Sequence, residues 1–194
     1  MGLPAEKLSI DQFMAWENLQ DTRHEFYRGE VFAMVGARRV HGLVTGNLFA
    51  AFKTHLKGSR CRAFVEAMKL QVAGNAIFYP DVFVTCDERD LKTDMVFMRP
   101  LLLVEVLSES TQAYDRGLKF TAYRQIETLR EYLLVDPDHR RVELFRRNDR
   151  GNFELIDQTG DTHLVLDSVA LRLPMAEVFD GVEDGGADSD EAAG

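Results

Sequence analysis

Two apolar runs, each carrying one acidic residue, limit what this chain can fold into. Residues 79–84 read Tyr-Pro-Asp-Val-Phe-Val, so Asp81 begins a β-branched run. Residues 101–107 read Leu-Leu-Leu-Val-Glu-Val-Leu, so Glu105 lies in the middle of a second run. Runs of this kind predict strands that are buried on both faces. A carboxylate in such a strand loses its water, which is costly unless the group is paired, protonated or bound to a metal.

The rest of the chain alternates helical and strand-like patterns, which predicts an α/β (α+β) fold with a mixed sheet. Ser9 and Gln12 form a capping-box pattern at the start of the first expected helix. A break at Arg28-Gly29 divides the first strand-like segment in two. Helices are expected at 9–16, 41–56 and 118–126, and strands at 25–35, 62–72, 79–86, 101–107, 131–137, 142–146, 153–156 and 164–166.

The length of 194 residues and the composition predict one globular domain, residues 1–180, followed by an acidic disordered tail, residues 181–194. The net charge of −9 is unfavourable for a nucleic-acid partner, but six acids from Asp180 onward leave about −3 for residues 1–179. Basic clusters occur at 23–28, 38–41, 53–62 and 140–147. This balance argues against tight, constitutive DNA binding but allows transient contact. A solvated surface is the alternative interpretation of these clusters.

The cysteine content and the N-terminus predict a cytoplasmic protein. Cys61 and Cys86 are too few for a disulfide framework, and both are expected to be small, reduced hydrophobic residues in strands. Residues 1–7 contain no apolar segment of the kind found in signal peptides. No apolar stretch approaches the ~18 residues that a membrane-spanning helix needs, so no membrane partner is expected.

Asp81, Glu105 and Lys119 together suggest metal-dependent phosphodiester hydrolysis. Mg²⁺ can activate water and absorb charge on a phosphate while only one or two carboxylates hold it. A nearby lysine can orient or deprotonate the water, or stabilise the transition state. Lys119 follows Glu105 by 14 residues, which is enough to pass through a loop and enter the next helix.

Several short motifs occur in an order that resembles a known family. They are Glu25-Phe26-x-x-Gly29-Glu30, Tyr79-Pro80-Asp81-Val82, Val104-Glu105-Val106-Leu107-Ser108-x-Ser110-Thr111, Asp115-x-x-x-Lys119-x-x-x-Tyr123 and Glu131-Tyr132-x-x-Val135-Asp136-Pro137. Together they resemble the Uma2 family, also catalogued as the uncharacterised-function family 820. That family belongs to the PD-(D/E)XK restriction endonuclease-like superfamily. The resemblance covers roughly residues 8–180.

The resemblance implies a restriction endonuclease-like core, in which helices flank a mixed central β-sheet. It implies Asp81 and Glu105 as ligands of Mg²⁺ or Mn²⁺, and Glu25 as an N-terminal acid that completes the site. The chain departs from the simple superfamily pattern because Leu107 stands two residues after the second acid, where a lysine is usual. The resemblance implies that the lysine has moved to the following helix, as Lys119.

Each of these residues also has a simpler interpretation. Asp81 could cap a turn, and Glu105 could pair with an arginine. Lys119 and Glu25 could lie on solvated faces. Asp115 fits a helix N-cap better than a ligand, and His41 fits a surface residue at a helix start. Tyr123 and Tyr132 fit core positions with a polar tip.

Three functions are compatible with the sequence. The first is a metal-dependent DNA endonuclease that contacts DNA transiently. The second is a nuclease-fold protein that no longer cuts and serves in binding or assembly, which the acidic balance and the displaced lysine favour. The third is a hydrolase of another phosphoester, such as RNA or a nucleotide. A homodimer would suit cleavage of two antiparallel strands.

Overall fold

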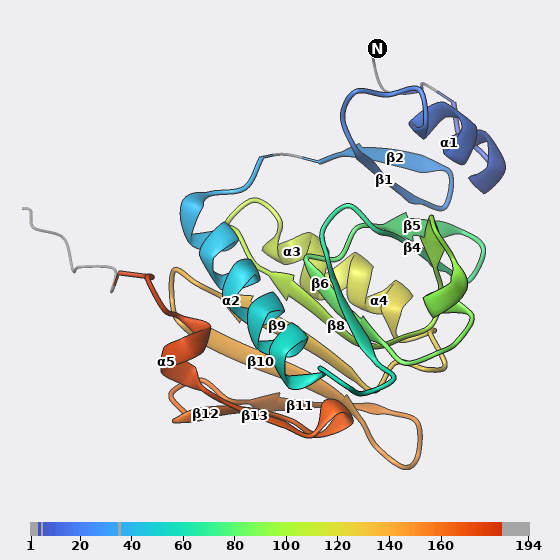
Figure 1. Cartoon of the computed structure of the whole chain (residues 1–194). Helices are drawn as coiled ribbons and strands as arrows, with labels where there is room; N and C mark the ends of the chain where they lie inside the picture. Colours follow the sequence, from blue (N-terminus) through green and yellow to red (C-terminus); the bar gives the residue numbers. More distant parts are fainter. Residues whose placement is uncertain (1–3, 5, 35, 184–194) are drawn as a thin grey trace, which may run out of the picture.

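A six-stranded mixed sheet forms the centre of the computed structural model, which describes residues 4, 6–34 and 36–183 (Figure 1). Its strand order is β11-β10-β9-β8-β6-β3. β8 and β9 run parallel, whereas β6 and β8 are antiparallel, so the predicted mixed sheet is confirmed. In the described part of the chain, no helix has the length and apolarity to cross a membrane. The strands are β3 (Arg62–Val65), β6 (Val82–Thr85), β8 (Pro100–Val106), β9 (Glu131–Asp136), β10 (Arg141–Arg147) and β11 (Phe153–Asp157).

Both faces of this sheet are covered, because the side chains of β6 and β8 alternate between two cores. Val82, Val84 and Val104 face a core that includes Leu48 and Phe52 of α2 (Arg39–His55). Phe83, Leu103 and Tyr132 face the other core, with Tyr123 of α4 (Phe120–Tyr123). Figure 1 shows α2 over one face and α4 over the other. The two acid-bearing runs are therefore buried on both faces, as predicted.

A second sheet of five strands, in the order β2-β1-β5-β4-β7, packs against the second core. β1 and β2 form a hairpin whose two-residue turn is Arg28-Gly29, both with positive φ. That conformation is the one favoured by tight hairpins, and it explains the predicted break. The helix α1 (Ile10–Glu17) has the predicted Ser9–Gln12 capping box. The strands are β1 (His24–Tyr27), β2 (Glu30–Ala33), β4 (Lys69–Val72), β5 (Ala76–Phe78) and β7 (Val96–Phe97).

The C-terminal segment covers the α2 side of the main sheet. Val178, Phe179 and Val182 are buried in the same core as α2, so the packed chain extends past the expected boundary at residue 180. Residues 184–194 of the expected acidic tail lie outside the described residues. This segment consists of β12 (His163–Leu166), β13 (Leu171–Pro174) and α5 (Met175–Val178).

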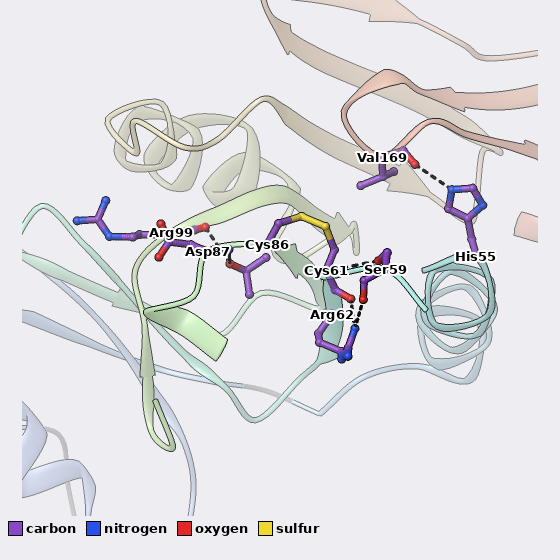
Figure 2. Close-up of a disulfide and its surroundings, with 9 residues drawn as sticks. His55, Ser59, Cys61, Arg62, Cys86, Asp87, Arg99 and Val169 are labelled. Atoms are coloured by element: carbon purple, nitrogen blue, oxygen red, sulfur yellow. Dashed lines mark hydrogen bonds between the residues drawn. A yellow bond between two sulfur atoms is a disulfide. The ribbon is translucent and has the colours of Figure 1, made fainter. Parts of the chain in front are cut away.

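The prediction that both cysteines are reduced is wrong. Cys61 and Cys86 form a disulfide, with their Cα atoms 4.1 Å apart. Figure 2 shows this bond between the start of β3 and the end of β6. The two strands pair with Arg62 opposite Thr85, so the residues just outside this register lie side by side. The cytoplasmic location, which the expectation of reduced cysteines supported, stays a prediction.

Candidate active site

Asp81 and Glu105 lie opposite each other on neighbouring strands. β6 and β8 pair with Val82 opposite Val104, and one further step of this register places Asp81 opposite Glu105. Residues opposite each other in an antiparallel pair project to the same face, with Cβ atoms about 5 Å apart. The Asp81 carboxylate accepts the backbone N–H of Val106 at 2.7 Å. The structure thus brings the two predicted acids to the same end of the β6–β8 pair, with Glu105 on the face that packs against the second core.

Lys119 reaches the same point from the segment that follows β8. Its ammonium Nζ lies 3.0 Å from Glu25 Oε1 and 3.2 Å from Glu105 Oε1. Lys119 ends a π-helical turn, Asp115–Lys119, between α3 (Gln112–Tyr114) and α4. Such turns within helices are frequent at functional sites. Lys119 is 6% exposed, so it does not lie on a solvated helix face.

Glu25 and Asp115 complete the carboxylate cluster around this ammonium. Glu25 is buried in β1, and the same oxygen that contacts Lys119 accepts the backbone N–H of Tyr79 at 3.1 Å. Asp115 is also buried, and its Oδ1 lies 3.2 Å from Lys119 Nζ. The interpretation of Asp115 as a helix N-cap is therefore wrong. Its spacing of four residues from Lys119 was the signal for this contact, since side chains at i and i+4 are neighbours on a helix.

Tyr123 is a further contact of Glu105. Its hydroxyl donates to Glu105 Oε1 at 2.8 Å, and the ring is fully buried. The hydroxyl of Tyr132 donates to the backbone carbonyl of Asp115 at 3.1 Å. Both tyrosines are core residues with a polar tip, as predicted. In addition, their tips fix two of the acidic residues of the cluster.

His41 belongs to the site, and the interpretation of it as a surface residue is wrong. It lies in the first turn of α2, and its Nε2 is 3.3 Å from Asp81 Oδ2. Its Nδ1 is 3.5 Å from the hydroxyl of the buried Thr45. The side chains of His41 and Asp81 are 15% and 17% exposed, whereas those of Glu25, Glu105 and Lys119 are 3–8% exposed. Asp81 and His41 are therefore the part of the site that meets solvent.

The site holds more negative than positive charge. Burial raises the pKa of the Glu105 carboxyl well above its usual value; Lys119 opposes this shift, and Asp115, Asp81 and Glu25 add to it. Burial alone would lower the pKa of Lys119, but Glu105, Glu25 and Asp115 raise it well above its usual value. Burial would lower the pKa of His41, but Asp81, with smaller contributions from Glu66 and Asp115, raises it above its usual value. Four carboxylates share one lysine and one histidine, so an added cation would be stabilised.

The donor atoms of this cluster are those that a hard divalent cation prefers. Carboxylate oxygens suit Mg²⁺ and Mn²⁺, and Mg²⁺ commonly uses one or two of them and keeps several waters. Within residues 4, 6–34 and 36–183, no three His, Cys, Asp or Glu side chains are arranged to hold a metal by themselves. The charge and chemistry of the cluster fit a two-carboxylate ion with water ligands, and they do not form a closed cage.

A match to a protein-family model shows which family this chain belongs to. The model of Uma2, described as "Putative restriction endonuclease", matches residues 10–176. The chain belongs to the Uma2 family. The match includes Glu25, Asp81, Glu105 and Lys119. The buried carboxylate cluster therefore lies within the part of the chain that matches Uma2.

The chain is also similar to two Synechocystis proteins and to one solved structure. An uncharacterized Synechocystis protein, slr1290, is 35% identical over 92% of this chain and 95% of its own length. A second, sll1609, is 33% identical over 72% of this chain and 81% of its own length. The crystal structure of an Anabaena variabilis protein described as "a putative nuclease belonging to DUF820" superposes with a TM-score of 0.72. It is 19% identical and covers 89% of this chain and 97% of that chain, which shows the shared fold.

Proposed function

We propose that this Uma2 protein is a metal-dependent endonuclease that hydrolyses DNA phosphodiester bonds at the carboxylate cluster. The observation that carries the proposal is the pair of opposed acids, Asp81 and Glu105, with Lys119 in contact with the second. Asp81 and Glu105 would hold Mg²⁺ or Mn²⁺, which supplies an activated water and absorbs charge on the phosphate when bound. The family description and the shared fold support nuclease chemistry.

The residues of the cluster have different roles in this proposal. The Val106 N–H and His41 hold the Asp81 carboxylate from two sides, which fixes its orientation. Lys119 has three N–H groups and three carboxylate neighbours, Glu25, Glu105 and Asp115. To contact a phosphate or the attacking water, the ammonium must release one of these neighbours. Glu25 and Asp115 therefore position Lys119, while Asp81 and His41 face the incoming substrate.

A plasmid-cleavage assay tests this function. Purified protein with Mg²⁺ or Mn²⁺ should nick or cut supercoiled plasmid DNA, and a chelator should stop the reaction. Asp81→Asn and Glu105→Gln should each lower the rate by at least about a hundredfold, since even groups that only support a metal ligand commonly contribute 10–100-fold. Glu177→Gln, at an exposed position on α5, should cut at the wild-type rate. Thermal melting confirms that each variant is folded.

Two results would contradict the proposal. One is a folded wild-type protein that cuts no DNA with either metal. The other is cleavage that persists in both Asp81→Asn and Glu105→Gln, because the activity would then arise elsewhere or from a contaminant. RNA and small phosphoesters in the same assay separate DNA cleavage from hydrolysis of another phosphoester. Light scattering in solution tests the predicted homodimer.

A nuclease-fold binding or assembly module is the second candidate. Lys119 favours it, because its ammonium already pairs with Glu105, one of the two proposed metal ligands. This candidate requires a folded protein with no heat of Mn²⁺ binding in calorimetry. Measurable Mn²⁺ binding that Asp81→Asn and Glu105→Gln abolish would exclude it as a metal-free module.

A further inference from the structure

A hollow of about 570 Å³ opens beside the disulfide, away from the carboxylate cluster. Four arginines and two acids supply its charged lining: Arg60, Arg89, Arg99, Arg130, Asp87 and Glu88. We call it the arginine hollow. Its size falls within the range of small-molecule sites and exceeds what a single phosphate needs.

The arginine hollow lies at the opposite end of the sheet from the candidate active site. Asp81 immediately precedes β6, whereas Cys86, which lines the hollow, immediately follows it. On β8, Glu105 is near the end of the strand and Arg99 precedes its start. Six residues of extended strand separate Arg99 from Glu105, a distance of about 20 Å. One small ligand therefore does not bridge the two sites.

Three of the arginines form no ion pair within the described residues. Asp87 is paired with Arg89, whose Nε and Nη2 lie 2.9 and 2.7 Å from its two oxygens. Glu88 pairs with Lys92 at 3.2 Å. Among the residues placed in the structure, the side chains of the other three make no ion pair or hydrogen bond; these are Arg60, Arg99 and Arg130. The four arginines and two acids of the lining leave a net charge of +2, and this excess of positive charge favours an anion.

Backbone hydrogen bonds anchor two of these arginines, Arg99 and Arg130. The Arg99 N–H donates to the buried Asp90 at 2.9 Å, and its carbonyl accepts from the buried Thr85 hydroxyl at 3.0 Å. The Arg130 N–H donates to Leu101 O, and its carbonyl accepts from the N–H of Arg147, both at 2.8 Å. An ordered backbone at these positions lowers the conformational entropy that the arginines lose when a ligand binds.

Arg60 comes from a separate segment, the turn before β3. The disulfide of the next residue, Cys61, joins this turn to Cys86 in the wall of the hollow. Figure 2 shows the Arg62 side chain closing the same turn, with Nη1 2.7 Å from the carbonyls of Ser59 and Cys61. The disulfide therefore holds Arg60 at the same end of the sheet as Arg99 and Arg130.

We propose that the arginine hollow binds a ligand bearing several phosphate charges. Guanidinium groups match phosphate oxygens with paired N–H donors, and three of them suit a polyphosphate better than a single carboxylate. Six of the residues that line the hollow are charged, and Cys86, Leu101 and Thr128 complete the wall, so the charged groups are placed to select an anionic ligand. The polyphosphate of a nucleotide and the backbone of a nucleic acid share this chemistry. The proposal does not depend on cleavage at the carboxylate cluster.

Calorimetry with inorganic tripolyphosphate tests the site. The full-length protein is titrated in the presence of a chelator, so that a metal at the carboxylate cluster does not contribute. Wild type should bind, and added salt should weaken binding. Arg99→Gln with Arg130→Gln should weaken binding roughly tenfold or more, since a charged hydrogen bond contributes about that factor. Arg60→Gln, at an exposed turn position, provides an independent variant if the double variant fails to fold.

The control variant is Arg172→Gln, an exposed arginine on β13 outside both sites, which should bind as wild type does. Competition by ATP or by a short DNA duplex then identifies the source of the phosphates: a nucleotide if only ATP displaces tripolyphosphate, a nucleic acid if DNA does so. No binding by wild type would overturn the proposal. Equal losses in Arg172→Gln and the hollow variants would also overturn it, because binding would then reflect general charge.

Discussion

Glu105 is the most deeply buried acid of the cluster, at 2% exposed. One of its oxygens receives both the Lys119 ammonium at 3.2 Å and the Tyr123 hydroxyl at 2.8 Å. The carboxylate occupies a position where its strand neighbours on the same face, such as Leu103, belong to the apolar core. A buried charge of this kind is tolerated only when its partners are present. The contribution of each partner can therefore be measured by removing it.

Tyr123→Phe should destabilise the fold by about 1–3 kcal/mol, because it leaves a buried carboxylate oxygen with one donor fewer. Urea unfolding followed by circular dichroism gives the change in the free energy of unfolding. Tyr27→Phe is the matched control, since the half-buried Tyr27 hydroxyl makes no hydrogen bond within the described residues. If both variants lose the same stability, the Tyr123–Glu105 bond contributes nothing specific.

Lys119→Met should destabilise by roughly 3–5 kcal/mol, because three carboxylates lose the ammonium between them. Adding Glu105→Gln should recover part of that loss, so a double-mutant cycle should give a coupling energy of about 1–3 kcal/mol. The exposed pair Lys92–Glu88 is the control, and its cycle should give about 0.5 kcal/mol or less. If the coupling energy of Lys119 and Glu105 were as small as that of Lys92 and Glu88, Lys119 would not be the counter-ion of Glu105.

Residues of the cluster were predictable from sequence to different degrees. Asp81 and Glu105 were conspicuous because an acid in an apolar strand is costly. Lys119 was a weak candidate from its position after Glu105 and was strengthened by the resemblance to Uma2, whereas Glu25 came only from that resemblance, because a lysine or glutamate in isolation usually lies at the surface. His41 gave no local signal, since its contact with Asp81 depends on how α2 packs across the sheet. Their catalytic roles stay predictions.

At the scale of elements, the turn between β1 and β2 places Glu25 in the cluster. Glu25 pairs with Phe32 across this hairpin, so the turn sets which face of β1 the glutamate occupies. The sequence predicted the break at Arg28-Gly29 and the main helix at 41–56, which the structure has as Arg39–His55. It did not predict the second sheet, because the pairing of β4 with β7 joins short segments far apart in the chain.

Gly29→Ala should destabilise this hairpin and, through it, the fold by about 1–2 kcal/mol. Gly29 has φ +95°, which an L side chain rarely adopts, and an added Cβ would lie 2.9 Å from Lys7 Cβ. Chemical unfolding measures the change. Gly46→Ala in α2 is the control, because a Cβ there meets no other atom within 4 Å and alanine favours a helix. Gly46→Ala should keep or raise stability, and a Gly29→Ala variant that did the same would contradict this account of the turn.

At the scale of the whole molecule, the central sheet joins the carboxylate cluster at one end to the arginine hollow at the other. The mixed sheet and its helices followed from the apolar runs and from the family resemblance. The disulfide did not, because two cysteines 25 residues apart become neighbours only through the pairing of β3 with β6. Cysteine number alone therefore led to the wrong expectation.

Reduction of the Cys61–Cys86 bond should lower the stability of the whole domain. The bond closes a loop of about 25 residues, and the restriction it places on the unfolded chain corresponds to roughly 3 kcal/mol. A reductant should therefore shift the urea midpoint of wild type downward. The double variant Cys61→Ser/Cys86→Ser should start near the lower midpoint and show no response to reductant. The β3–β6 ladder remains in either case, so the reduced protein should refold to the same sheet. A wild-type midpoint that does not move although free thiols have appeared would show that strand pairing alone holds this end of the sheet.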